Sequence, residues 1–160
     1  MCMPRLITKP IKTVLRMAGF AIAVTLPFRS PIADARNVKY LLPIKAALQS
    51  TAAREKPDGS IKWFFGTERP PEIRTMLGNA AVHRRIGTRP VNDVNTCNTA
   101  FLLALVDLEK QAKRLSANAV VNIVSYYKNI QMSSATEFEC HAGSGAHVFL
   151  KGDFAKIAPE

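Results

Sequence analysis

Histidine and cysteine side chains are the groups of this chain best suited to chemistry, and half of them lie in one short segment. Residues 140–147 read CHAGSGAH and hold two of the three histidines and one of the three cysteines. His83 and Cys97 lie nearer the N-terminus. Imidazoles and thiolates bind zinc-like ions, glycine-rich loops bind phosphate, and serine acts as a nucleophile. The segment therefore raises three hypotheses: a metal site, an anion site and a catalytic site.

A metal site would draw on His83, His141 and His147. In a regular β-strand His141 and His147 share a face, but about 20 Å separates them at roughly 3.3 Å per residue. Cys140 points to the opposite face. A bend at residues 143–145 would bring the two histidines closer, so a shared ion stays open as an alternative. The sequence favours histidines exposed on a strand, and we expect no metal and no other cofactor.

Phosphate binding and nucleophilic catalysis find less support in the same segment. Gly143 and Gly145 lack the strand-to-helix context in which backbone N–H groups and a helix dipole face an anion. Ser144 resembles a nucleophile motif only superficially, and the chain is far shorter than a hydrolase fold. Glu137 and Glu139 share a strand face, where solvation is the ordinary expectation. We assign no catalytic and no cofactor-binding residue and expect a protein that is not an enzyme.

Residues 1–35 have the parts of a secretory signal peptide. A positively charged start precedes the apolar run MAGFAIAVTLPF, and Ala33 and Ala35 form a small-residue cleavage site that would leave Arg36 first in the mature chain. The run is too short to span a bilayer as a stable helix. A short membrane anchor is the alternative. We expect a periplasmic or secreted protein with no stable membrane anchor after cleavage.

Cleavage would remove Cys2 and leave Cys97 and Cys140. An even number of cysteines in an oxidising compartment predicts a disulfide between them. Closing this loop of about 43 residues would stabilise the fold by roughly 3–4 kcal/mol in the chain-entropy estimate. A pair of buried thiols is the alternative.

Basic residues exceed acidic ones even after cleavage. Loss of five Lys/Arg and of Asp34 with the signal lowers the formal net charge from +10 to +6. Such a surface attracts anionic lipid or polymer in a salt-dependent way, with Arg84, Arg85 and Arg89 as a candidate patch. We expect an envelope component as partner, with an anionic one as the candidate, and no specific nucleic acid. An ordinary solvated basic surface is the alternative.

A small α+β domain is expected to position these residues. The strongest element is a helix near residues 96–115, where apolar residues recur at three- and four-residue spacing. Alternating or β-branched runs predict strands over residues 60–66, 79–88, 117–127 and 136–152, the last being one bent strand or two short ones. Paired prolines and polar residues predict loops over residues 67–76, 89–95 and 128–135.

The expected fold is a mainly antiparallel sheet of about four strands packed against the helix near 96–115, plus a short N-terminal helix. Residues 36–59 would form a lead-in that contains this short helix, and residues 60–160 a single small α+β domain. Trp63, Tyr126 and Tyr127 are either exposed contact residues or parts of the core.

The chain from residue 60 onward resembles a known family. The segments IKWFFG, TCNTAFLLALVDLEKQAKRLSANAVVNIVSYYKN and SSATEFECHAGSGAHVFLKG are similar to small exported bacterial proteins of unknown function, often labelled as an excinuclease (UvrA-type) ATPase subunit. The resemblance covers about three-quarters of the chain. Its most specific parts are ANAVVNI with the helix before it, and ECHAGSG.

A more distant similarity extends to YbjQ-type domains, sometimes called heavy-metal-binding proteins, and to the folded domain of the Rcs-type envelope-stress lipoprotein. Both resemble this chain in a helix, a strand like ANAV and a strand with small residues after a cysteine or tyrosine. The second resemblance implies a disulfide-stabilised α/β fold that includes Cys140. That domain has four cysteines and a lipid-anchor cysteine, whereas the mature chain would have two cysteines and no such anchor.

The excinuclease label can be tested on the residues. The chain has no G-x-x-x-x-G-K-[ST] loop for a nucleotide phosphate and no paired C-x-x-C spacing for zinc. We therefore expect an exported, disulfide-stabilised, non-enzymatic envelope module with a binding, structural or stress-related role. A metal-binding periplasmic protein that uses His83, His141 and His147 is the alternative, followed by a small enzyme.

Intact-mass measurement on natively exported protein tests two of these predictions together. We expect a mass that corresponds to a chain beginning at Arg36 and lacking two hydrogens, because Cys97 and Cys140 are joined. Thiol counting under denaturing conditions should then find no free thiol. Two free thiols, or a retained N-terminal segment, would contradict the corresponding prediction.

Overall fold

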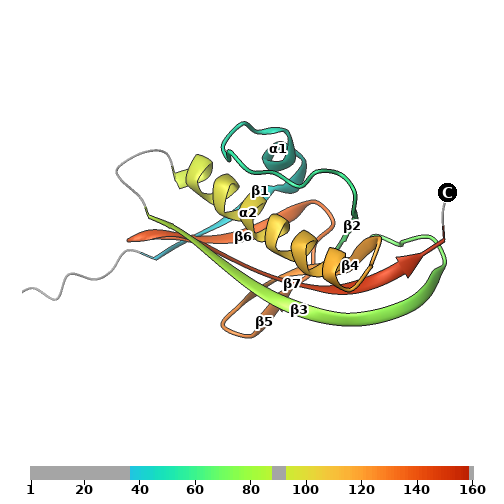
Figure 1. The fold of residues 1–160 in the computed structure, drawn as a ribbon. Helices are drawn as coiled ribbons and strands as arrows, with labels where there is room; N and C mark the ends of the chain where they lie inside the picture. The colour runs from blue at the N-terminus through green and yellow to red at the C-terminus, as the bar shows by residue number, and fades with distance from the viewer. Residues whose placement is uncertain (1–36, 88–92, 159–160) are drawn as a thin grey trace, which may run out of the picture. The chain divides into compact units, whose positions relative to one another are not determined.

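Two helices and seven strands make up the part of the chain that the computed structural model describes, residues 37–87 and 93–158 (Figure 1). These residues belong to one compact unit. In chain order the elements are β1 (Val38–Pro43), α1 (Ile44–Gln49), β2 (Lys62–Phe65), β3 (Ile73–Gly87), α2 (Asp93–Arg114), β4 (Ala119–Tyr127), β5 (Ile130–Met132), β6 (Glu137–Ala142) and β7 (Gly145–Ile157).

Strand β7 organises the sheet because it has partners along both edges. One edge pairs antiparallel with β3 over the whole length of β7. Along the other edge, residues 146–148 of β7 pair with β6 and residues 150–155 pair with β4. β1 extends the sheet beyond β6, and β2 extends it beyond β4. The sheet therefore branches at Phe149, where β7 changes partners.

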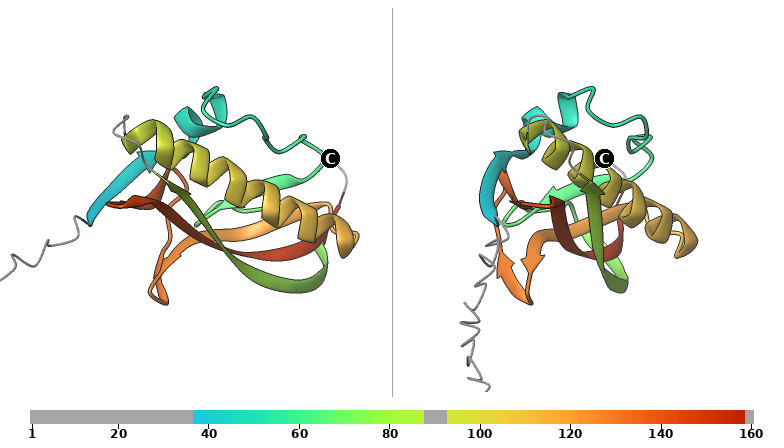
Figure 2. Two further views of the ribbon diagram at one scale, coloured as in Figure 1. Left: turned by 60° about the vertical axis from the view of Figure 1, so that its left-hand side comes forward. Right: turned by 90° about the vertical axis from the view of Figure 1, so that its left-hand side faces the viewer.

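Helix α2 lies across one face of the sheet, and the β4–β5 hairpin projects on the other side (Figure 2). The apolar stripe of α2, which includes Phe101, Leu105 and Leu108, is fully buried against the even-numbered residues of β7, such as Val148 and Leu150. Burial of such side chains drives folding at about 25 cal/mol per Å² of apolar surface. Neither described helix is both long and apolar enough to cross a membrane.

Two turns show how local conformation supports this arrangement. Helix α2 ends where Ser116 adopts φ +56°, and the N–H of Ala117 then bonds the carbonyl of Ala112, which satisfies a helix-end acceptor. Lys128 and Asn129 both have positive φ, at 50° and 65°. Positive φ at both central residues is the type I′ geometry that joins tightly paired strands, and here it forms the β4–β5 hairpin.

The expected sheet of about four mainly antiparallel strands on one long helix was wrong. The sheet is curled and mixed, with seven described strands, because β2 runs parallel to β4 while the other pairs are antiparallel. The long helix expected near residues 96–115 is α2, and the short N-terminal helix is α1.

The missed strands have identifiable causes. β1 lies in the expected lead-in, and its pairing with β6 is a long-range contact that local pattern does not reveal. β3 begins within the expected loop 67–76, because its first residue, Ile73, comes two residues after Pro71 and the prolines exclude only the preceding residues from the strand. β5 has three residues, too few for an alternating pattern to register.

A disulfide joins Cys97 near the start of α2 to Cys140 in β6, the pairing expected from the sequence. Both cysteines are fully buried, and their Cα atoms lie 5.9 Å apart. The bridge ties the helix to the strand next to β7 and closes a loop of 43 residues.

The double variant Cys97→Ala/Cys140→Ala tests how much this disulfide contributes to the stability of the fold. We expect it to lower the free energy of unfolding by roughly 3–4 kcal/mol, because the unfolded chain regains the entropy that the loop removes. Urea denaturation of the oxidised protein and the variant measures the difference. The reduced wild type is the control and should behave like the variant, whereas a loss below about 1 kcal/mol would contradict the estimate.

Candidate functional site

The three histidines meet on the face of the sheet opposite α2. His141 in β6 and His147 in β7 are direct cross-strand partners. His83 in β3 pairs in register with Phe149, two residues from His147 on the same face. Together with Tyr127 and Asn37 they line a cavity of about 510 Å³, called here the histidine pocket. Three adjacent strands thus present one imidazole each to the same space.

A tight turn explains why His141 and His147 lie together. The estimate of about 20 Å assumed a continuous strand, but the chain reverses between β6 and β7, where the Gly143 N–H bonds the Gly145 carbonyl at 2.9 Å. Gly145 also has to be small, because a Cβ there would lie 2.9 Å from the Ile86 carbonyl oxygen. The two glycines therefore serve the hairpin and its close packing against β3.

His83 and His147 form a direct pair. His83 Nε2 lies 3.1 Å from His147 Nδ1, so that one ring donates a hydrogen bond to the other. The rings are nearly parallel, with centroids 5.3 Å apart, and His83 also stacks on Phe149 at 4.0 Å. Stacking between aromatic planes fixes the orientation of both imidazoles before any ligand arrives.

The surroundings keep both members of this pair neutral near pH 7. Burial lowers the pKa of His83, and the positive charge of Arg85 lowers it further. Burial also lowers the pKa of His147, with added effects from His83, Arg85 and His141. A neutral imidazole keeps a nitrogen lone pair, the form in which histidine binds metal ions.

His141 is held differently from the pair. Its Nε2 lies 2.5 Å from Glu139 Oε1, and its Nδ1 lies 3.1 Å from Asn37 Oδ1. Its ring stacks on Tyr127 with centroids 3.5 Å apart. The Asn37 amide donates in turn to the Tyr127 hydroxyl at 3.4 Å, which sets the orientation of the amide. Both ring nitrogens of His141 therefore lie within hydrogen-bond distance of an oxygen atom.

The branch of the sheet makes room for this arrangement. Where β4 and β6 part at Phe149, the Ser125 hydroxyl accepts a hydrogen bond of 2.8 Å from the Glu139 N–H and links the two strands. Tyr127, at the end of β4, then reaches His141 and packs its edge against Phe149 at 5.3 Å. A continuous ladder at this point would have filled the space with backbone.

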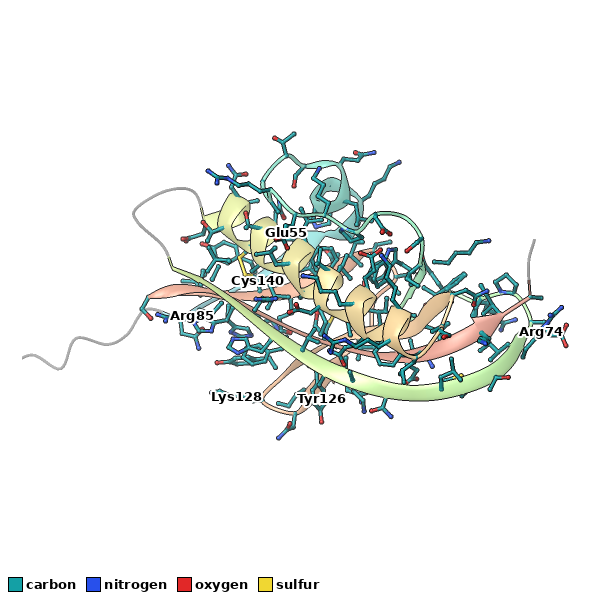
Figure 3. All side chains as sticks on the ribbon, viewed as in Figure 1. Glu55, Arg74, Arg85, Tyr126, Lys128 and Cys140 are labelled. Carbon is teal, nitrogen blue, oxygen red and sulfur yellow. A yellow bond between two sulfur atoms is a disulfide. The ribbon has the colours of Figure 1, made fainter. Side chains whose placement is uncertain are left out.

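The predicted basic patch is divided by the alternation of side chains along β3. Arg84 faces α2 and forms a two-pronged ion pair with Asp107. Arg85 (Figure 3) lies opposite His147 in the strand register and donates at 3.3 Å to the carbonyl of Ser144, a residue of the histidine pocket. Arg89 lies outside the described residues. The structure therefore brings Arg85 to the three histidines and separates it from Arg84.

The aromatic candidates also divide. Trp63 is half-buried and packs against the core, and it contributes to a separate apolar groove beside α1. Tyr126 and Tyr127 are half-buried at the end of β4. Figure 3 shows Tyr126 with Lys128 on the hairpin side of the sheet, away from α2. Of the three, only Tyr127 belongs to the histidine pocket.

Two pocket residues and a neighbouring carboxylate were missed at the sequence level. Asn37 was placed in the lead-in, Glu139 was read as solvated, and Phe149 as an ordinary strand residue. The spacing of Glu139 and His141, two residues apart on one strand face, was an available signal for a carboxylate beside an imidazole. No local signal placed Asn37, because it arrives through the pairing of β1 with β6.

Within residues 37–87 and 93–158 no group of three or more histidine, cysteine, aspartate or glutamate side chains is placed to hold a metal ion. The direct pair His83 and His147 offers two nitrogens, and the disulfide engages both described cysteines. No family model, curated protein or solved structure matches the chain. The resemblances noted above stay predictions, and function has to be inferred from the site itself.

Acidification should weaken the fold through the histidine pair. The pKa values of His83 and His147 lie below the ordinary 6.5 in the folded protein, so the unfolded chain binds more protons below that pH. Stability from this source is present above pH 6.5 and falls as the pH drops from about 6.5 through the lowered values. Urea denaturation at pH 7.5 and pH 5 measures the fall. The control His83→Gln/His147→Gln should show a smaller fall, and an equal fall would contradict the assignment.

Proposed function

We propose that the protein is an exported, disulfide-stabilised, non-enzymatic envelope module that binds a divalent transition-metal ion in the histidine pocket. The observation that carries the proposal is the pair of neutral imidazoles, His83 and His147, with facing nitrogens 3.1 Å apart. Nitrogen ligands of this kind suit zinc, copper and nickel.

The spacing of the two nitrogens supports a shared ion. Zinc binds imidazole nitrogens at about 2.0–2.1 Å in a tetrahedral arrangement, which separates two ligand nitrogens by roughly 3.3 Å. The observed separation of His83 Nε2 and His147 Nδ1, 3.1 Å, differs from this value by a few tenths of an ångström. Both rings have to turn so that their lone pairs point at one ion, and the ring that donates the hydrogen bond has to change tautomer. Water supplies the remaining ligands.

Ring packing supports the proposal because it reduces the entropic cost of binding. His83 lies flat on Phe149, with planes 1° apart, and His147 is held against His83. Side chains that are fixed before binding lose less rotamer freedom when a ligand arrives. The disulfide supports the proposal of a non-enzymatic protein in a separate way. Cys97 and Cys140 are bonded to each other, so neither is a thiolate that could act as a nucleophile.

An anionic ligand in the same pocket is the second candidate. Arg85 supports it, because its guanidinium lies opposite His147 and has N–H groups beyond the one that reaches Ser144. The basic composition of the chain points the same way. The same charge opposes a cation, so Arg85 distinguishes the two candidates.

Calorimetric titration of untagged protein with Zn²⁺ and Ni²⁺ at pH 7.5 tests the metal proposal. We expect binding of one ion per chain, and we expect His83→Ala or His147→Ala to weaken it by at least tenfold, because each removes one of two protein nitrogens. Asn79→Ala, at an exposed position of the same strand as His83, is the matched control and should bind like the wild type. Equal binding by the wild type and the His147 variant would refute the site.

Arg85→Gln should change the affinities for cation and anion in opposite directions. Removal of the positive charge is expected to tighten Zn²⁺ binding up to about fivefold, the scale of one solvent-exposed charge interaction. The same change should weaken binding of inorganic phosphate. Titration with each probe at low and high salt measures both effects. Phosphate binding that Arg85→Gln abolishes, with no Zn²⁺ binding in the wild type, would favour the anionic ligand instead.

A further inference from the structure

His141 is the imidazole of the pocket whose two ring nitrogens both have an oxygen atom within hydrogen-bond distance. Glu139 Oε1 lies 2.5 Å from its Nε2, and Asn37 Oδ1 lies 3.1 Å from its Nδ1. A nitrogen that donates a proton to an oxygen has no lone pair for a metal. Tyr127 covers the ring on its flat side. These three residues are called here the His141 clamp.

The position of His141 nevertheless suits a third ligand. It is the direct cross-strand partner of His147 and lines the same cavity as His83 and His147. Side chains that face each other across antiparallel strands have Cβ atoms about 4.5–5.5 Å apart. Rotation about the side-chain bonds of His141 is the movement that would turn one of its nitrogens toward the pair.

The clamp also connects the pocket to the edge of the sheet. Asn37 immediately precedes β1, and Lys39 in β1 pairs in register with His141. Lys39 Nζ also lies 3.5 Å from Glu139 Oε2, on the other oxygen of the carboxylate that holds His141. Two residues at the start of β1 therefore act on the ring, one directly and one through Glu139.

We propose that His141 is a releasable third ligand of the metal site, and that Asn37 competes with the metal for its Nδ1. This inference rests on the proposed metal-binding function. The contact between His141 Nδ1 and Asn37 and a metal–His141 bond at that nitrogen exclude each other, so metal occupancy and the contact just before β1 are coupled reciprocally. Metal binding then loosens the first residues of the edge strand.

A double-mutant cycle on Asn37 and His141 tests the inference. We expect Asn37→Ala to tighten Zn²⁺ binding about fivefold. The metal-free state loses one neutral hydrogen bond in this variant, and the free energy of such a bond corresponds to about that change in the binding constant. His141→Ala should weaken binding, and Asn37→Ala/His141→Ala should bind no better than His141→Ala alone. Asn79→Ala is again the matched asparagine control, and thermal denaturation checks that each variant is folded.

A second readout follows His141 itself. In NMR spectra of the wild type, Zn²⁺ should shift the ring resonances of His141 and Tyr127 together with those of His83 and His147. Equal affinity of the wild type and the Asn37 variant, or a gain that persists in the double variant, would overturn the inference. If His147→Ala abolishes binding in that case, the metal site itself stands. Absence of Zn²⁺ binding in the wild type would overturn both proposals.

Discussion

The double pairing of β7 is the constraint on which the rest of the structure depends. A strand has two edges, and β7 satisfies one with β3 and divides the other between β4 and β6. Its residues Ala146, Val148, Leu150 and Phe154 pack in the core beneath α2, while His147 and Phe149 on the opposite face line the pocket. The division at Phe149 separates β4 from β6 and leaves space for side chains. The core and the candidate site therefore lie on opposite faces of β7.

Local pattern in the sequence was sufficient for some elements. The three- and four-residue spacing of Ala100, Phe101, Ala104 and Leu105 identified α2, and the cysteine count identified the disulfide partners. Long-range pairing was not accessible in the same way. β1 carries no signal for its contact with β6, and a parallel strand such as β2 is defined by a partner far along the chain. The number of strands and the mixed topology follow from such contacts.

The candidate site shows the same division between local and long-range information. The sequence named all three histidines and the bend that could bring two of them together, but strand geometry alone argued against a shared ligand. The hairpin turn reversed that argument for His141 and His147, and the pairing of β3 with β7 added His83. The clamp on His141 depends on Asn37, whose position depends on β1. The sequence shows which side chains could bind a ligand, whereas strand pairing decides which of them lie together.

Alternation of side chains along β6 gives the disulfide a role at the pocket. Cys140 points to the helix side and His141, the next residue, to the pocket side, so the strand that carries the imidazole is covalently attached to α2. A chain produced where cysteines stay reduced keeps every pocket residue and lacks this attachment. Protein from a reducing cytosol and protein from an oxidising compartment are therefore two chemically different samples. The redox history of a preparation becomes a variable in any ligand measurement on this site.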